Sequence, residues 1–191
     1  MFAAVSAALA LAGVVYLRTT GLVATAEPSA FEARVARAAR QLAIPAVERE
    51  RPNPVPVSPE VLALGRSHFA DHCASCHAND GSGNVEMGRN LFPKAPDMRL
   101  HPTQDLTDGE LFWVIERGIR FTGMPGWRTG TSEGAEASWH LVHFIRHLPR
   151  ITEAEIEEME AMNPRSPAEI RQDIEAERFL QGGDPAAPHV H

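Results

Sequence analysis

The sequence predicts an all-α protein whose centre, residues 58–150, holds three principal helices. Three segments there combine apolar residues at helical spacing with residues that cap or stop a helix. No β-α-β pattern is visible beside them. A chain of 191 residues is expected to form one domain of ordinary size with appendages.

The first helix should begin after Ser58, a capping residue, with Pro59 in its first turn, and run towards Cys73. Its packing face comprises Val61, Leu62, Gly65 and Phe69. A glycine inside a helix costs about 1 kcal/mol relative to alanine. Because Gly65 has no side chain, we expect another helix to cross closely there and offset that cost.

The second helix should span residues 107–117. Thr107 can cap it, Glu110 completes a capping box, and Gly118 can end it. The third should span about residues 136–148 and stop at Pro149. Its apolar arc comprises Leu141, Phe144, Ile145 and Leu148.

The segment Cys73-Ala-Ser-Cys76-His77 contains the only two cysteines of the chain. The spacing C-x-x-C-H is that of a covalent c-type haem attachment site, in which both thiols add to the haem vinyl groups and the histidine reaches the iron. A redox dithiol or half of a zinc site has the same cysteine spacing. The first needs a β-α-β context and the second another regular pair of ligands, and neither is visible.

A second haem ligand is available at Met124, 47 residues after His77, in the segment Gly123-Met-Pro-Gly-Trp127. Glycine and proline favour a fixed loop, whereas a methionine that fills a core more often lies on a periodic helix face. Met87 and Met98 are the alternatives nearby. Histidine and methionine ligation suits electron transfer, because the thioether raises the reduction potential.

With these motifs, residues 58–150 resemble a class I c-type cytochrome. The features that carry the resemblance are Gly65 and Phe69 before the cysteine motif, the Thr-Gly-Met124-Pro segment and Trp139 in the last apolar helix. The resemblance implies a class I cytochrome c fold around one covalent haem c, with the last helix crossing the first near Gly65. Cys73 and Cys76 would be the attachment residues, His77 the proximal ligand and Met124 the distal ligand.

The resemblance also suggests groups around the haem. In the family a proline carbonyl holds the proximal histidine, and Pro93 or Pro96 could do so here. Arg89, Arg99 and Trp127 are candidates to meet the haem propionates. Three features depart from the family: the loop 78–89 lacks the usual Gly-Pro-Leu pattern, the chain has long extensions at both ends, and Lys94 is the only lysine.

Residues 1–26 are interpreted as a signal peptide or a transmembrane anchor. Residues 2–17 carry no charge, and the apolar stretch can extend past Arg18 to residue 23. The uncharged run of 16 residues, 2–17, is by itself near the lower limit for crossing a bilayer. Ala24-Thr-Ala26 is typical of a cleavage site. Both interpretations export residue 27 onward.

Residues 27–57 are interpreted as a spacer, helical at first and then rich in proline. Phe31, Val35, Ala38 and Leu42 recur at helical spacing, with Arg34, Arg37 and Arg40 between them. This helix could lie at a membrane surface or pack loosely on the haem domain. Four prolines between residues 52 and 59 then predict a stiff, extended segment.

Residues 151–191 carry 10 acidic and 3 basic side chains, whereas residues 1–150 carry 15 of each, so the tail accounts for the net charge of −7. Capping boxes at Thr152 and Ser166 predict helices at about 153–162 and 167–181, and Gly182-Gly183 would end the second. Ile170, Ile174 and Phe179 could dock one of them on the domain. The tail could steer a basic partner, or cover the domain as a solvated helical hairpin.

Histidines allow a second metal site in two places. His140, His143 and His147 share one helix face, and His189 and His191 end the chain. Either set could bind copper or zinc weakly. Exposed surface histidines are the alternative interpretation of both.

The sequence therefore predicts an electron carrier rather than an enzyme, working in a respiratory or related redox chain. A quinol-oxidising complex or a dehydrogenase would be the donor, and a terminal oxidase or reductase the acceptor. The protein would lie on the periplasmic side, anchored in the cytoplasmic membrane through residues 2–23 or soluble after cleavage. A haem subunit of a larger oxidoreductase and a haem sensor or ligand-binding module are the alternatives. No basic surface for nucleic acid is apparent.

Overall fold

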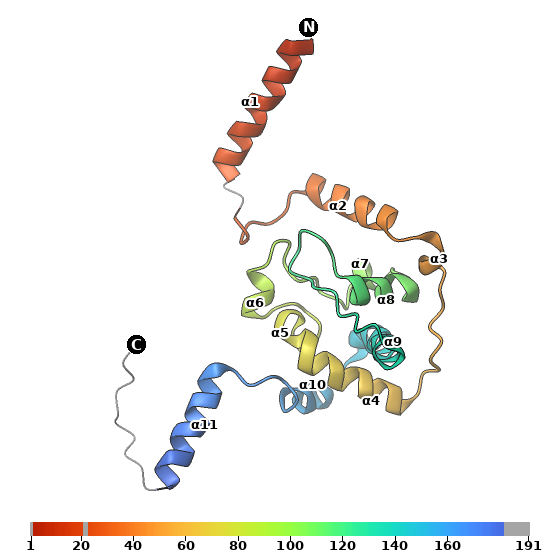
Figure 1. Cartoon of the computed structure of the whole chain (residues 1–191), viewed down its shortest axis with the longest axis vertical. Coiled ribbons are helices and arrows are strands. Elements are labelled where there is room, and N and C mark those ends of the chain that lie inside the picture. Colours follow the sequence, from red (N-terminus) through yellow and green to blue (C-terminus); the bar gives the residue numbers. More distant parts are fainter. Residues whose placement is uncertain (1, 21–22, 182–191) are drawn as a thin grey trace.

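The computed structural model describes residues 2–20 and 23–181, and all regular structure within them is helical. This agrees with the predicted all-α class. The elements are α1 (Phe2–Thr20), α2 (Ala30–Ala43), α3 (Ala46–Arg49), α4 (Pro59–His68), a π-helical turn (Phe69–Cys73), α5 (Ala74–His77), α6 (Glu86–Arg89), α7 (His101–Gln104), α8 (Asp108–Arg117), α9 (Ser132–His147), a 3₁₀ turn (Leu148–Arg150), α10 (Glu153–Glu160) and α11 (Pro167–Leu180). Figure 1 shows a central group of helices, α4 to α10, from which α1 and α11 project.

The predicted capping residues begin the helices of the central group. The hydroxyl of Ser58 accepts from the backbone N–H of Val61 at 3.2 Å and starts α4. Thr107 and Glu110 form the expected capping box of α8. The third principal helix, α9, begins four residues earlier than predicted, because Thr131 caps it by accepting from Gly134.

The close crossing expected at Gly65 is present between α4 and α9. A Cβ atom added to Gly65 would lie 2.4 Å from the carbonyl oxygen of His140 and 3.0 Å from the Cβ of Phe144. Only a glycine allows the two backbones to approach this closely. Beside the crossing, the rings of Phe69 and Phe144 meet with centroids 5.2 Å apart, and both side chains are fully buried.

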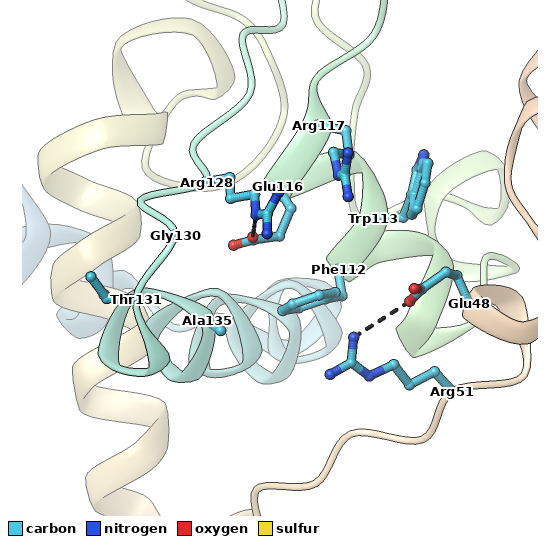
Figure 2. Close-up of a pocket in the computed structure, with 10 residues that line it drawn as sticks. All are labelled: Glu48, Arg51, Phe112, Trp113, Glu116, Arg117, Arg128, Gly130, Thr131 and Ala135. Atoms are coloured by element: carbon cyan, nitrogen blue, oxygen red, sulfur yellow. Dashed lines mark hydrogen bonds and ion pairs between the residues drawn. The ribbon is translucent and has the colours of Figure 1, made fainter.

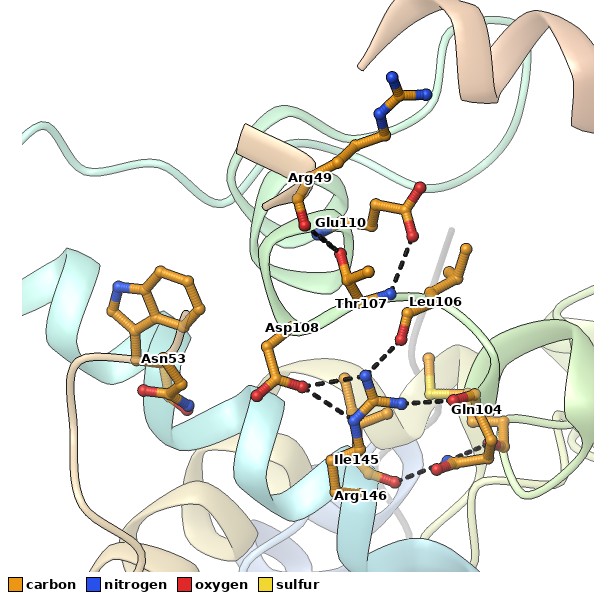
Figure 3. Close-up of polar contacts among 11 residues, drawn as sticks. Arg49, Asn53, Gln104, Leu106, Thr107, Asp108, Glu110, Ile145 and Arg146 are labelled. Carbon is orange, nitrogen blue, oxygen red and sulfur yellow. Dashed lines mark hydrogen bonds and ion pairs between the residues drawn. The ribbon is translucent and has the colours of Figure 1, made fainter. Parts of the chain in front are cut away.

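Polar contacts fix the segment between α7 and α8 onto α9 (Figure 3). The guanidinium of Arg146 donates to the Asp108 carboxylate at 2.9 Å, to the Gln104 carbonyl at 2.7 Å and to the Leu106 carbonyl. The Gln104 amide in turn donates to the carbonyl of Ile145 at 2.9 Å. These hydrogen bonds, together with Leu106 packed against the core, hold the loop that precedes α8.

The N-terminal extension is helical and is tied to the domain at α3. Gly109 packs on this segment so closely that a Cβ there would lie 1.8 Å from the Glu48 carbonyl oxygen. The Thr107 hydroxyl also donates to the carbonyl of Arg49 at 2.6 Å. Ile44, between α2 and α3, is 3% exposed. The prolines before Pro59 then lead the chain across to α4, as predicted.

Among the helices that the structure describes, none combines the length and the apolar character needed to cross a membrane. The predicted transmembrane anchor at residues 2–23 is therefore not supported. Residues 2–20 do form a helix, α1, with Arg18 in its last turn.

Within residues 151–181, the acidic tail meets the domain through Ile151 and the helix α10. Met159 of α10 is fully buried, and Arg66 of α4 pairs with Glu155 at 3.3 Å and Glu158 at 2.7 Å. His147 of α9 contacts Glu155 at 2.8 Å. The tail therefore covers part of the domain, as one of the two interpretations predicted.

The second tail helix, α11, does not dock, and the expectation for its apolar residues was wrong. Ile170, Ile174 and Phe179 are 45%, 52% and 64% exposed. Acidic residues surround them, and none of the side chains of α11 whose exposure the structure describes is buried. The glycines predicted to end this helix, at 182 and 183, lie outside the described residues.

Candidate haem site

The cysteine motif lies where α4 continues through the π-helical turn into α5. The turn widens the helix just before the motif, and such turns are frequent at functional sites. Phe69, Ala70 and Ala74 are buried and fix this segment in the core, while Cys73 and Cys76 remain partly exposed. Residues three apart on a helix share a face. Both thiols are free and lie on one surface of the same rigid segment.

The environment of the cysteines does not suit a redox dithiol. Burial, followed by the proximity of Cys76, raises the pKa of the Cys73 thiol to about 12. Nucleophilic and redox cysteines need a lowered pKa, because the thiolate is the reactive form. Among the described residues, no group of three or more histidine, cysteine or acidic side chains could hold a metal ion. The zinc interpretation thus lacks its other ligands there.

His77 is buried, with 7% of its surface exposed. Burial lowers the pKa of its imidazole to about 4, while the carbonyl of Pro96 acts in the opposite direction. Its Nδ1 atom is buried and makes no hydrogen bond of normal geometry, so the carbonyl acts on the ring from nearby without a complete bond. The imidazole is therefore neutral at physiological pH, as an iron ligand must be.

Of the two prolines expected near His77, Pro96 is the one whose carbonyl acts on it. Metal-binding histidines use a neutral imidazole whose second ring nitrogen donates to such a carbonyl, whereas the buried Nδ1 of His77 has no hydrogen-bond partner. The two free thiols and the neutral imidazole on one segment fit the donor set that a c-type haem requires.

The loop after the motif folds tightly against it, although its sequence departs from the family pattern. The backbone N–H of Gly83 donates to the His77 carbonyl at 2.8 Å. A Cβ at Gly88 would lie 2.2 Å from the carbonyl oxygen of Cys76. The N–H of Met98 closes the loop on the Gly81 carbonyl at 2.8 Å.

Arginines hold this loop. Arg99 donates to Asp97 at 2.7 Å and to Asp80 at 2.9 Å, and Arg89 donates to the side chain of Asn84 at 2.8 Å. Both arginines were candidates for the haem propionates. The two carboxylates already neutralise Arg99, which makes it the weaker candidate. Trp127, the other candidate, is half-buried.

Met124 lies in a loop that is bonded to the end of α8. Its carbonyl accepts from Ile119 at 3.1 Å, and its N–H donates to the Thr122 hydroxyl at 3.1 Å. At Gly118, where φ is +67°, a Cβ would lie 2.6 Å from the Met124 carbonyl oxygen. The backbone around the methionine is thereby fixed, as the glycine and proline context predicted.

Two contacts bring the Met124 loop to the segments that flank the cysteine motif. On one side, Gly123 packs against Leu91, with a potential Cβ 2.5 Å from that side chain. On the other side, the rings of Trp127 and His72 lie edge to face, 5.3 Å between centroids. The two alternative candidate ligands differ from Met124, which is half-buried. Met87 is 56% exposed, and Met98 is 9% exposed and lies in the core.

The histidines of α9 do not form a common site. His140 faces Glu136 at 3.8 Å, His143 contacts the Val55 carbonyl at 2.7 Å, and His147 contacts Glu155. Each ring has a different partner, so these three histidines do not form the metal site that their spacing allowed. The other candidate pair, His189 and His191, lies outside the described residues.

A separate pocket of about 280 Å³ lies on the far side of α8 (Figure 2). Its lining comprises Glu48, Arg51, Phe112, Trp113, Glu116, Arg117, Arg128, Gly130, Thr131 and Ala135. Glu116 is buried and accepts from the Ser138 hydroxyl at 2.7 Å, which keeps that part of the pocket polar. The lining contains neither the cysteine motif nor Met124, so this pocket is distinct from the haem site.

Comparison with known proteins assigns the class. Residues 60–145 match the family described as cytochrome C oxidase, cbb3-type, subunit III, and the matched range includes both cysteines, His77 and Met124. With the helical fold and the motif, this shows that residues 60–145 form a class I c-type cytochrome domain, which implies haem c binding.

Two curated relatives are similar to a short part of the chain. Each is a Cbb3-type cytochrome c oxidase subunit FixP, one from Sinorhizobium medicae (strain WSM419) and one from Rhizobium meliloti (strain 1021). Both are 52% identical over 33 residues, which is 17% of this chain. The chain covers only 11% of the length of either relative.

Proposed function

We propose that the domain carries one haem c, bound covalently through Cys73 and Cys76, with His77 and Met124 as its axial ligands. The proposed domain limits are those predicted, residues 58–150, between a spacer at 27–57 and an acidic helical extension at 151–191. The observation that carries the proposal is the position of the Met124 loop. It contacts Leu91 on one side of the motif and His72 on the other.

The residues of the chain then have distinct tasks. Bound haem supplies a one-electron couple between ferric and ferrous iron. His77, kept neutral by burial, holds the proximal position, and the Met124 thioether favours the reduced state. With both axial positions filled, small ligands are excluded. The domain is thus an electron carrier that breaks no bond of a substrate.

We further propose that the domain works on the periplasmic side and passes electrons to a terminal oxidase. The printed names of the family and of both relatives support an oxidase subunit. The donor would be a quinol-oxidising complex or a dehydrogenase. A free periplasmic shuttle is the alternative, and purification from native membranes separates the two, because a subunit would remain in a stoichiometric complex.

The site is tested first by the mass and spectrum of the native protein. We expect a mass increase of one haem that persists after denaturation, and a methionine–iron charge-transfer band in the ferric state. Met124→Ala should keep the haem bound, remove the band, lower the reduction potential and admit carbon monoxide. The matched controls Met87→Ala and Met98→Leu should keep the band. Loss of the band in either control instead would contradict the assignment of Met124 and indicate a haem whose distal ligand is exchangeable.

A further inference from the structure

One face of α2 is apolar and has no partner within the described part of the chain. Phe31, Val35, Ala38 and Leu42 are spaced by four, three and four residues, so they follow one stripe of the helix. The three larger side chains are 75%, 50% and 87% exposed, in that order. No described residue of α2 is buried. The stripe is therefore available to a partner outside the chain.

The attachment of α2 to the domain directs this stripe outward. At the end of the helix, the buried Ile44 and a hydrogen bond of 3.2 Å from Arg49 to the Gln41 carbonyl fix its position. Arg40 points inward, since its Nε atom is buried and burial lowers its pKa while Glu110 opposes that shift. Residues two apart on a helix lie about 200° apart, so Leu42 faces away from the domain.

The charge beside the stripe is positive. Arg34 lies at one edge of it and Arg37 lies further round the same side of the helix; both are exposed, and Glu32 is the one acid among the residues of α2. That carboxylate is already used in the capping box with Ser29. The chain as a whole is acidic, with a net charge of −7. An apolar stripe edged by arginines on an acidic protein fits an anionic lipid surface, where the guanidinium groups meet phosphates.

The preceding helix supports a lipid partner over a protein partner. The side chains of α1 whose exposure the structure describes are all exposed, and most of them are apolar. The Tyr16 hydroxyl donates to Glu32 at 2.9 Å, which links α1 to the first turn of α2. Figure 1 shows α2 along one side of the domain, with α1 leaving from its beginning. A second exposed apolar helix, α1, thus lies next to the first turn of α2.

We propose that α2 lies in the interface of an anionic membrane, with Phe31, Val35 and Leu42 among the acyl chains and Arg34 and Arg37 on the lipid phosphates. The side of the domain that carries α2 then faces the bilayer. The orientation of the cytochrome domain is thereby fixed, because α3 is held rigidly on α8. This inference does not depend on the haem ligands.

Local hydrogen exchange of the full-length, haem-loaded protein tests the proposal independently of any membrane affinity of α1. The probes are vesicles of phosphatidylglycerol with phosphatidylcholine, and vesicles of phosphatidylcholine alone. On the anionic vesicles, we expect amide exchange in residues 30–43 to slow about tenfold or more. Exchange in α11 should not change. On the neutral vesicles, or at high salt, the protection of α2 should be weaker.

Variants separate the stripe from apolar exposure in general. Phe31→Ser with Leu42→Ser should abolish the protection of α2. The matched pair Ile170→Ser with Ile174→Ser, on the acidic α11 where both isoleucines are also exposed, should leave it unchanged. If the rate of amide exchange in α2 did not change when anionic vesicles were added, the proposal would be overturned. Protection that appears without vesicles as protein concentration rises would also overturn it, because the stripe would then be an interface between copies of this chain.

Discussion

The rings of His72 and Trp127 meet edge to face, with their centroids 5.3 Å apart and their planes at 87°. His72 directly precedes the first cysteine of the motif, and Trp127 follows Met124 by three residues. The contact therefore joins the segment proposed to attach the haem to the loop proposed to supply the distal ligand. The backbone N–H of Trp127 also donates to the Ile115 carbonyl at 2.9 Å, which fixes the loop to α8.

Removing the Trp127 ring should loosen the distal ligand without unfolding the domain. In Trp127→Ala, we expect a weaker methionine–iron charge-transfer band and measurable binding of carbon monoxide, because the Met124 loop loses one of its two lateral contacts. Absorption spectroscopy of the ferric and the ferrous protein checks both effects. Trp127→Phe keeps a ring at this position and should restore most of the band. Trp113→Ala removes an indole from the far side of α8 and is the control; an equal loss of the band there would refute the role of the ring contact.

The crossing of α4 and α9 should not tolerate a side chain at residue 65. Gly65→Ala places a Cβ 2.4 Å from a backbone oxygen, and overpacking of this kind costs about 1–3 kcal/mol or more. Denaturant unfolding of the holoprotein measures the loss. Gly13→Ala on α1 meets nothing within 4 Å and should leave the free energy of unfolding of the domain unchanged. If both variants had the same free energy of unfolding, the close approach at residue 65 would not be what stabilises the packing of α4 on α9.

The features that could be predicted from the sequence are those encoded by neighbouring residues. The caps at Ser58, Thr107 and Thr152 depend on residues within one turn, and all three begin helices. The glycine at the helix crossing was predictable because its cost within a helix needs a compensating contact. The early start of α9 was also readable, since Thr131 is a capping residue before a helical pattern.

What could not be predicted depends on partners distant in sequence. Arg66 meets Glu155 across 89 residues, and periodicity contains no information about such a pair. For Arg99 this holds only of Asp80, 19 residues away, since its other partner Asp97 is two residues away; the two carboxylates leave Arg99 a weaker candidate for a haem propionate. The predicted docking of α11 was wrong for a similar reason. Its isoleucines suggested burial, but both are exposed and neither is covered by the described part of the domain.

Docking of the tail through α10 should contribute measurably to stability. Met159 is fully buried, and truncation of a buried methionine to alanine costs about 2–5 kcal/mol. Met159→Ala should therefore lower the free energy of unfolding and speed proteolysis at residues 150–166. Met162→Ala, three residues further on and 38% exposed, should change the stability by less than about 0.5 kcal/mol. A stable Met159→Ala protein with unchanged proteolysis would mean that α10 does not hold to the domain in solution.

The loop over the haem motif should weaken in acid through Asp97. Hydrogen bonds from Arg99 lower the pKa of Asp97, while partial burial opposes the shift. A carboxyl group whose pKa is lower in the folded state contributes stability that is fully present above its unfolded pKa, about 3.9. That contribution is lost as the pH falls through the folded pKa, because the protonated group no longer pairs with Arg99.

Asp97→Asn should therefore lower stability at neutral pH and flatten its decline below about pH 4 relative to the parent protein. Unfolding measured across this range, with the haem absorption recorded in parallel, checks the prediction. Asp105→Asn is the matched control, because that carboxylate is 72% exposed and contacts only His101. If the free energy of unfolding fell as steeply below pH 4 in Asp97→Asn as in the parent protein, the Asp97–Arg99 pair would not be the cause of the pH dependence.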